Sequence, residues 1–197
     1  MTLDAYRDAF VEHQKVLADV EATQLPAIEL LANEICSALA AGGKVVVFGN
    51  GGSAADAQHL ATELIGRFGG VRRSLAAIAL TTDSSALTAI GNDFGFEEVF
   101  ARQVEGLVLP QDLVLAISTS GRSQNVVRGL EAARQRGAVT AALCGQGGRL
   151  AEVADRVVAV PSQTTSRIQE AHALIIHLVC ETIDGWATGG DGASRTG

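Results

Sequence analysis

The sequence predicts an α/β protein, a three-layer αβα sandwich built on a five-stranded parallel sheet. Short apolar runs recur along the chain, and helical stretches separate most of them. This is the pattern of parallel strands joined by right-handed crossover helices. The runs are rich in Val, Leu, Ile and Ala with little polar alternation, as expected of strands covered on both faces. They occupy residues 45–48, 75–80, 113–117, 139–143 and 157–160.

Two helices are expected before the first strand, together forming a helical pair over residues 1–43. Apolar residues at helical spacing form one stripe before Pro26 and another after it, and Gly42-Gly43 is a helix stop. Neither helix belongs to a βα repeat, so we expect them to cover the sheet or another subunit. His13 lies outside the first stripe, which predicts a solvated surface histidine.

Length and composition indicate one domain over residues 1–187, followed by a Gly- and Ser-rich tail at 188–197 that we expect to be disordered. The net charge of −7, with scattered basic residues, argues against a nucleic-acid partner. The sequence contains no signal-peptide pattern and no apolar stretch long enough for a membrane span. We therefore expect a soluble cytoplasmic protein whose three cysteines are reduced, buried thiols.

The turn after the first strand has the features of an anion site. Gly49, Asn50, Gly51 and Gly52 allow positive φ and close approach of a ligand. Ser53 is predicted to cap a helix starting at residue 54, whose first amides would point back at the turn.

A second polar turn follows the third strand. It contains four hydroxyl residues and precedes a helix expected over 126–136, so hydroxyls, free amides and a helix terminus could together hold phosphate. The alternative is an ordinary turn whose hydroxyls cap their own helix. The four residues are Ser118, Thr119, Ser120 and Ser123.

Polar residues that could act as catalytic groups also lie on two helices. His59 and Glu63 are four residues apart and therefore share one helix face. Gln169 and His177 interrupt an apolar helix expected over 167–186, where polar groups need partners.

Nucleotide-binding motifs account for fewer of these features. The spacing Gly-x-Gly-x-x-Ala from Gly49 fits a loose dinucleotide fingerprint, with Asp83 as the acidic residue, but leaves the serine-rich turn unexplained. No Gly-Lys-Ser/Thr follows the glycines, which excludes a Walker-type phosphate loop.

Four motifs in order resemble the sugar isomerase (SIS) domain family and, within it, the phosphoheptose isomerases: GNGGSAADAQH-x-x-x-E, AIGNDFGFE, ISTSGRSQN and RIQE-x-H-x-x-x-x-H. The resemblance covers nearly the whole chain. It implies a homotetramer, with active sites near the subunit interfaces, that converts sedoheptulose 7-phosphate to a manno-heptose 7-phosphate through an enediol.

The resemblance also implies site roles. One zinc ion per subunit would be bound by His59, Glu63, Gln169 and His177, with Glu63 and His177 also acting as base and acid. Substrate contacts would come from the two polar turns, from Gln169 and from the second motif. These contacts comprise Asn50, Gly51, Gly52, Ser53, Asn92, Asp93, Ser118, Thr119, Ser120 and Ser123.

Two alternatives remain open at this point. The same family contains a noncatalytic protein that binds the replication initiator, but that branch lacks the counterparts of Glu63 and His177. Another SIS isomerase or a sugar-phosphate-sensing regulator is the other possibility, although such regulators usually carry a DNA-binding segment, which is not evident here.

Overall fold

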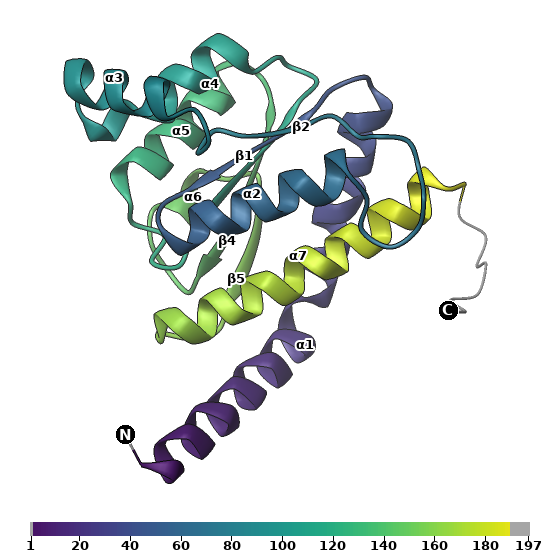
Figure 1. Ribbon diagram of the computed structural model, residues 1–197, viewed down its shortest axis with the longest axis vertical. Helices are drawn as coiled ribbons and strands as arrows, with labels where there is room; N and C mark the ends of the chain where they lie inside the picture. Colours follow the sequence, from purple (N-terminus) through teal and green to yellow (C-terminus); the bar gives the residue numbers. More distant parts are fainter. Residues whose placement is uncertain (1, 190–197) are drawn as a thin grey trace.

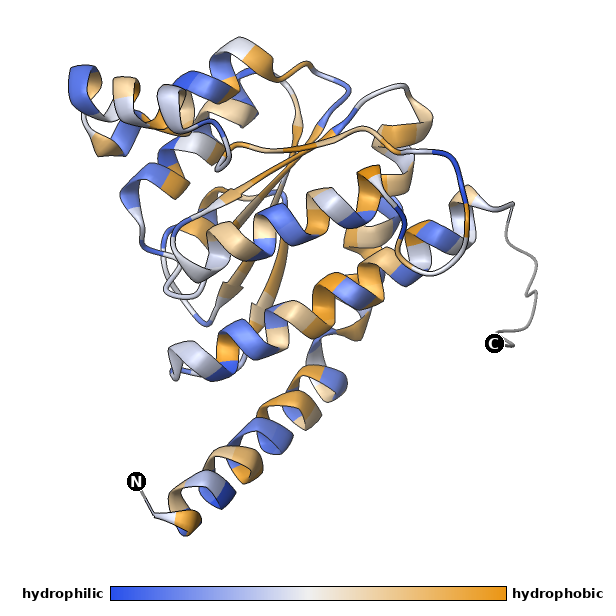
Figure 2. Cartoon of the chain, viewed as in Figure 1, coloured by the Kyte–Doolittle hydropathy of each residue, from blue (hydrophilic) through white to orange (hydrophobic). Residues whose placement is uncertain are grey.

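A five-stranded parallel sheet lies at the centre of the molecule (Figure 1), in the strand order β2-β1-β3-β4-β5. The computed structural model describes residues 2–189. Every residue of β1 and β3 is buried, in keeping with sequences that are apolar up to their last residues, Gly49 and Ser118. Figure 2 shows the sheet as the most hydrophobic part of the chain. The strands are β1 (Val45–Gly49), β2 (Ala77–Ala79), β3 (Leu113–Ser118), β4 (Val139–Gly145) and β5 (Arg156–Val160).

Helices cover both faces of this sheet, which confirms the predicted three-layer sandwich. Side chains of Val45 and Val47 pack with α1, α2 and α7 on one face, whereas Val46 and Phe48 pack with α4, α5 and α6 on the other. The helices are α1 (Leu3–Ala40), α2 (Gly52–Ile65), α3 (Ser84–Phe94), α4 (Ala101–Leu107), α5 (Gln124–Gln135), α6 (Leu150–Val153) and α7 (Thr165–Ala187), with a short 3-10 helix at Phe96–Glu98.

The N-terminal region is helical as predicted, but the boundary expected at Pro26 is wrong. A single helix, α1, passes through Pro26. Proline removes one backbone hydrogen bond from a helix interior, at a cost of about 3 kcal/mol. Val16 and Val20 before Pro26 and Ile28 after it are all buried in the same core, so packing on both sides offsets that cost. The first half of α1 extends beyond the body of the domain (Figure 1).

Of the remaining predictions about the organisation of the chain, the structure tests some and leaves others as predictions. All three cysteines are free and buried, as expected. Within residues 2–189, no helix is long and apolar enough to cross a membrane. The domain limits, 1–187, stay a prediction. Most of the tail expected at 188–197 lies outside the described residues.

Candidate active site

Helices α2 and α7 lie side by side on one face of the sheet and run in the same direction (Figure 1). Each begins beyond the carboxyl ends of the strands, where ligands bind in open parallel sheets. A Cβ added at Gly52, at the start of α2, would run into the side-chain amide of Gln169. Gln169 thus lies against the first turn of α2, and glycine is the residue that permits this approach.

About two turns further along both helices, three titratable side chains come together. His59 Nε2 lies 3.2 Å from Glu63 Oε1 and 3.4 Å from His177 Nε2. The two imidazole rings meet edge to face, with centroids 5.1 Å apart. The structure therefore joins residues separated by more than a hundred positions in the sequence at one place between α2 and α7.

The two distances measured at His59 are compatible with neighbouring ligands of a zinc ion. Two atoms bound at about 2.0–2.1 Å to a tetrahedral zinc lie roughly 3.3 Å from each other, close to both distances measured at His59. Imidazole nitrogen and carboxylate oxygen are suitable zinc ligands. Nevertheless, the described residues contain no group of three or more His, Cys, Asp or Glu side chains already arranged to hold a metal. Gln169, on α7, lies against the first turn of α2, about two turns from the trio.

The turn between β1 and α2 differs in one detail from the sequence prediction. The helix begins at Gly52, its N-cap is Gly51 with φ of 56°, and no side chain caps it. The expected cap, Ser53, is therefore wrong, since Ser53 is a buried residue inside the first turn. A glycine in the left-handed region takes the capping position and leaves the first amides of α2 without side-chain partners.

Asn50 in this turn is fixed by a residue that the sequence analysis did not single out. Its Nδ2 donates to Asn125 Oδ1 at 2.8 Å, and Asn125 Nδ2 donates back to Asn50 Oδ1 at 2.9 Å. Asn125 is buried, lies in the first turn of α5 and also accepts from the Val126 amide. This reciprocal amide pair ties the two polar turns together at the carboxyl edge of the sheet.

The hydroxyl-rich turn after β3 borders a cavity of about 110 Å³. Thr119 and Ser120 line it, together with Arg122, Gln146 after β4, and Thr165 in the first turn of α7. The N-terminus of α7 adds partial positive charge to a concave site lined by hydroxyls and a guanidinium, which suits an anion. The sequence analysis missed the contribution of Arg122, Gln146 and Thr165.

Only some of the hydroxyls in this turn hydrogen-bond to the backbone of the turn itself. Ser118 Oγ accepts from the Gly121 amide and Ser120 Oγ from the Arg122 amide, both at 3.2 Å. Ser123 is the N-cap residue of α5 but makes no side-chain capping bond. The alternative of a turn that merely caps its own helix is therefore incomplete, because the Ser123 hydroxyl stays available.

Asn92 and Asp93 are not gathered with the other predicted site residues within one chain. Both are exposed on α3 and hydrogen-bond to each other at 2.7 Å. The partly buried Leu87 and Ile90 of α3 pack on the face of the sheet opposite to α2 and α7. Their role as substrate contacts stays a prediction.

Comparison with known proteins places this geometry in a family. A sequence model described as SIS domain matches residues 9–145. The phosphoheptose isomerase of Aquifex aeolicus is 50% identical over 179 residues, covering 87% of this chain and 94% of that protein. The one from Nitratiruptor sp. is 52% identical over 184 residues, covering 92% and 98%. The chain belongs to the phosphoheptose isomerase family. The predicted family and enzyme class are thereby confirmed.

A solved phosphoheptose isomerase agrees in three dimensions as well. The structure from Neisseria gonorrhoeae is 43% identical, with a TM-score of 0.88, and the match covers 93% of this chain and 100% of that one. Coverage near complete on both sides shows that the likeness extends over the whole fold. The noncatalytic alternative is not favoured by these relatives, which are named as isomerases.

Two polar residues near the site are buried. Asp56, one turn before His59, has a buried Oδ2 without a hydrogen-bond partner. Burial raises the pKa of its carboxyl to about 6, although the charge of His59 lowers it in part. His172 on α7 is fully buried, and neither ring nitrogen makes a hydrogen bond of normal geometry, although the Cys144 main chain lies near the ring. Burial lowers the pKa of His172 to about 4, with the Cys144 main chain opposing part of that shift.

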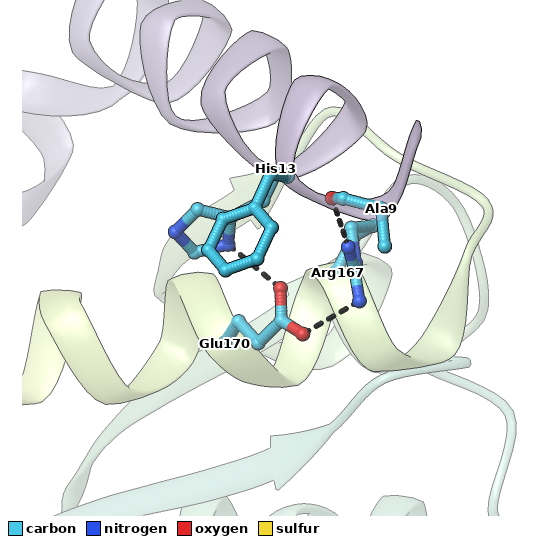
Figure 3. Close-up of a pocket in the computed structure, with 5 residues that line it drawn as sticks. Ala9, His13, Arg167 and Glu170 are labelled. Atoms are coloured by element: carbon cyan, nitrogen blue, oxygen red, sulfur yellow. Dashed lines mark hydrogen bonds and ion pairs between the residues drawn. The ribbon is translucent and has the colours of Figure 1, made fainter. Parts of the chain in front are cut away.

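A larger cavity, of about 270 Å³, lies where the first half of α1 crosses the start of α7 (Figure 3). His13 was expected to be solvated, but it is only one-third exposed and its Nδ1 lies 2.7 Å from Glu170 Oε2. Arg167 donates to the other oxygen of Glu170 at 2.7 Å and to the Ala9 carbonyl. Apart from the buried Nε of Arg167, which has no hydrogen-bond partner, these polar groups pair with one another, and we assign this cavity to the joint between the two helices.

Proposed function

We propose that the chain converts sedoheptulose 7-phosphate to D-glycero-D-manno-heptose 7-phosphate through an enediol, the first step toward nucleotide-activated heptose. The observation that carries this proposal is the meeting of Glu63 and His177 at His59 within one chain. Ketose to aldose conversion requires a base that moves a proton between adjacent carbons, and a carboxylate beside an imidazole meets that requirement.

The distance between the anion cavity and the titratable trio is suited to a long sugar phosphate substrate. The anion cavity lies at the carboxyl ends of the strands, whereas His59 is seven residues into α2, about 10 Å further along the helix axis. Phosphate held by Thr119 and Ser120 would leave an opened seven-carbon chain to extend alongside α2 and α7 toward the titratable trio. Anchoring the far end of the substrate in this way fixes C1 and C2 relative to the base.

Three protein groups have tasks in the reaction. Glu63 takes the proton from C1 of the ketose and returns it to C2, so that the carboxylate is regenerated. His177 assists the accompanying transfer of a proton from the C1 hydroxyl oxygen to the C2 carbonyl oxygen. Gln169, beside the first turn of α2, orients the hydroxyls of the middle of the chain.

We also propose one zinc ion per subunit, bound by His59, Glu63 and His177 with Gln169 moving in as a fourth ligand. Support comes from the two separations at His59, which match neighbouring ligands on a tetrahedral ion. When bound, zinc would polarise the carbonyl and stabilise the charge of the enediolate.

A homotetramer with active sites near its interfaces completes the proposal. The first half of α1 exposes large apolar side chains, among them Tyr6 at 55% and Phe10 at 70% exposure. Helix α3 has no buried residue and ends at the half-exposed Phe94. Apolar surface of this extent is typical of protein–protein contact. A second subunit could bring Asn92 and Asp93 to a neighbouring site. The cytoplasmic location stays a prediction.

The test of the proposed function is incubation of the purified protein with sedoheptulose 7-phosphate in deuterium oxide, followed by NMR. We expect manno-heptose 7-phosphate carrying solvent deuterium at C2, because an enediol mechanism lets the abstracted proton exchange with solvent. Absence of both product and exchange, together with binding of the replication initiator, would favour the noncatalytic alternative instead.

A further inference from the structure

The segment between α2 and β2, residues 66–74, passes across the C-terminal part of α7 (Figure 1). We call this segment the strap. It leaves the end of α2 that carries Glu63 and contacts the helix that carries His177. Its contacts therefore connect the two helices whose side chains form the reactive trio.

Arg72 is the centre of the strap. Its side chain is only 1% exposed. Nη2 donates to the Glu63 carbonyl at 2.7 Å and Nη1 to the Leu64 carbonyl at 2.9 Å, while Nε donates to the Asp184 carboxylate. Carbonyls in the last turn of a helix have no partner within the helix. Arg72 thus fixes the end of α2 at the residue that carries the proposed base.

Asp184 holds the other side of this connection. It lies on α7, about two turns beyond His177, and accepts from the Gly69 amide at 2.8 Å as well as from Arg72. Asp184 is nearly buried, so the pair is shielded from solvent. A charge-assisted pair in such a site is directional and rigid.

The strap also packs directly on the proton-transfer residues. The Phe68 ring lies 5.4 Å from the His177 ring, centroid to centroid. Nearer the end of α7, the Arg73 guanidinium lies over the Trp186 ring. These contacts limit how far His177 and the end of α7 can move relative to the strap.

We propose that Arg72 and Asp184 are positioning residues that set the separation of Glu63 and His177. The proposal rests on the proposed function, since it assumes that these two groups carry the proton transfers. Catalytic groups must be held within about 0.5 Å of their working geometry, and an error of about 1 Å can reduce the rate on the order of 10²-fold. The anion cavity receives no residue of the strap, and α7 contributes to it only near its start, far along the helix from Asp184. The loss should therefore fall on kcat rather than on KM.

The chain offers a matched control for this idea. Asp112 is a buried carboxylate that accepts from the Lys44 amide at 2.9 Å, from Lys44 Nζ at 2.5 Å and from the Leu109 amide at 2.8 Å. It lies directly before β3, at the opposite end of the sheet from the strand termini that face the site. Asp112→Asn therefore removes a comparable carboxylate without touching the strap.

The experiment measures kcat and KM for sedoheptulose 7-phosphate in wild type, Asp184→Asn and Asp112→Asn, each corrected for the folded fraction from thermal unfolding. We expect Asp184→Asn to lower kcat by 10- to 100-fold with KM within threefold of wild type. Asp112→Asn should keep kcat within threefold although it also loses stability. If Asp184→Asn does not fold, Arg72→Lys takes its place. The guanidinium donates to four acceptors, the carbonyls of Glu63, Leu64 and Arg73 and the Asp184 carboxylate, whereas a lysine ammonium has three N–H donors on a single nitrogen.

Equal kcat for the two variants per folded molecule would overturn the positioning role, and so would a rise in KM with kcat intact. The activity of the wild type distinguishes failure of the proposed function from failure of the strap's positioning role. An inactive wild type would refute the proposed function and the strap's role with it. An active wild type accompanied by an unimpaired Asp184→Asn would refute only the role of the strap.

Discussion

Asp56→Asn should stabilise the protein above pH 6 and change how stability depends on pH. The carboxyl of Asp56 is nine-tenths buried, Oδ2 has no partner, and burial raises its pKa from 3.8 to about 6. The native state therefore holds this proton more tightly than the unfolded state. Between pH 3.8 and 6 the free energy of unfolding falls as pH rises, and above pH 6 the loss is complete.

The size of the loss follows from the shift of about two pKa units at about 1.4 kcal/mol each, which gives roughly 3 kcal/mol. Urea unfolding of wild type and Asp56→Asn at pH 3.5 and pH 7 measures it. The advantage of the variant should be larger at pH 7 than at pH 3.5 by about 2–3 kcal/mol. Any fixed cost of the amide cancels in this comparison. An advantage that is the same at both pH values would refute the reasoning.

Two further outcomes follow from the site. Asn125→Ala removes both hydrogen bonds to Asn50 and leaves that amide unpaired. The free energy of unfolding should therefore fall by about 1–3 kcal/mol, and KM for sedoheptulose 7-phosphate should rise. An unchanged urea midpoint would contradict this prediction. Treatment with a chelator should abolish turnover, and Zn²⁺ should restore it better than Mg²⁺, because a site with two imidazoles favours zinc. Full activity of protein shown by elemental analysis to be metal-free would contradict the zinc proposal.

Much of the fold was predictable because burial on both faces leaves a clear mark on the sequence. The runs that became β1 and β3 are apolar at every position inside the strand, so their period could not be confused with that of a surface helix. Pro26 misled the prediction for a physical reason. A local hydrogen-bond loss favours a break, and only the three-dimensional packing of Val20 and Ile28 in one core shows that the helix continues.

Spacing along helices predicted one contact of the trio, that of His59 with Glu63. His59 and Glu63 share a face of α2 by their four-residue separation alone, but the approach of His177 depends on α2 and α7 lying side by side. The Asn50–Asn125 pair and the strap contacts of Arg72 join residues that no periodicity connects. Such partners are fixed by tertiary packing and leave no local pattern to read.

Glu63 is the central residue of the proposed mechanism, as the base that moves the proton between C1 and C2. Its test is the rate of product formation from sedoheptulose 7-phosphate in deuterium oxide by wild type and by Glu63→Gln, with binding of the sugar phosphate measured by calorimetry. Loss of a positioned base should lower the rate on the order of 10²- to 10⁴-fold while binding is largely kept. Turnover by Glu63→Gln at the wild-type rate would contradict the account.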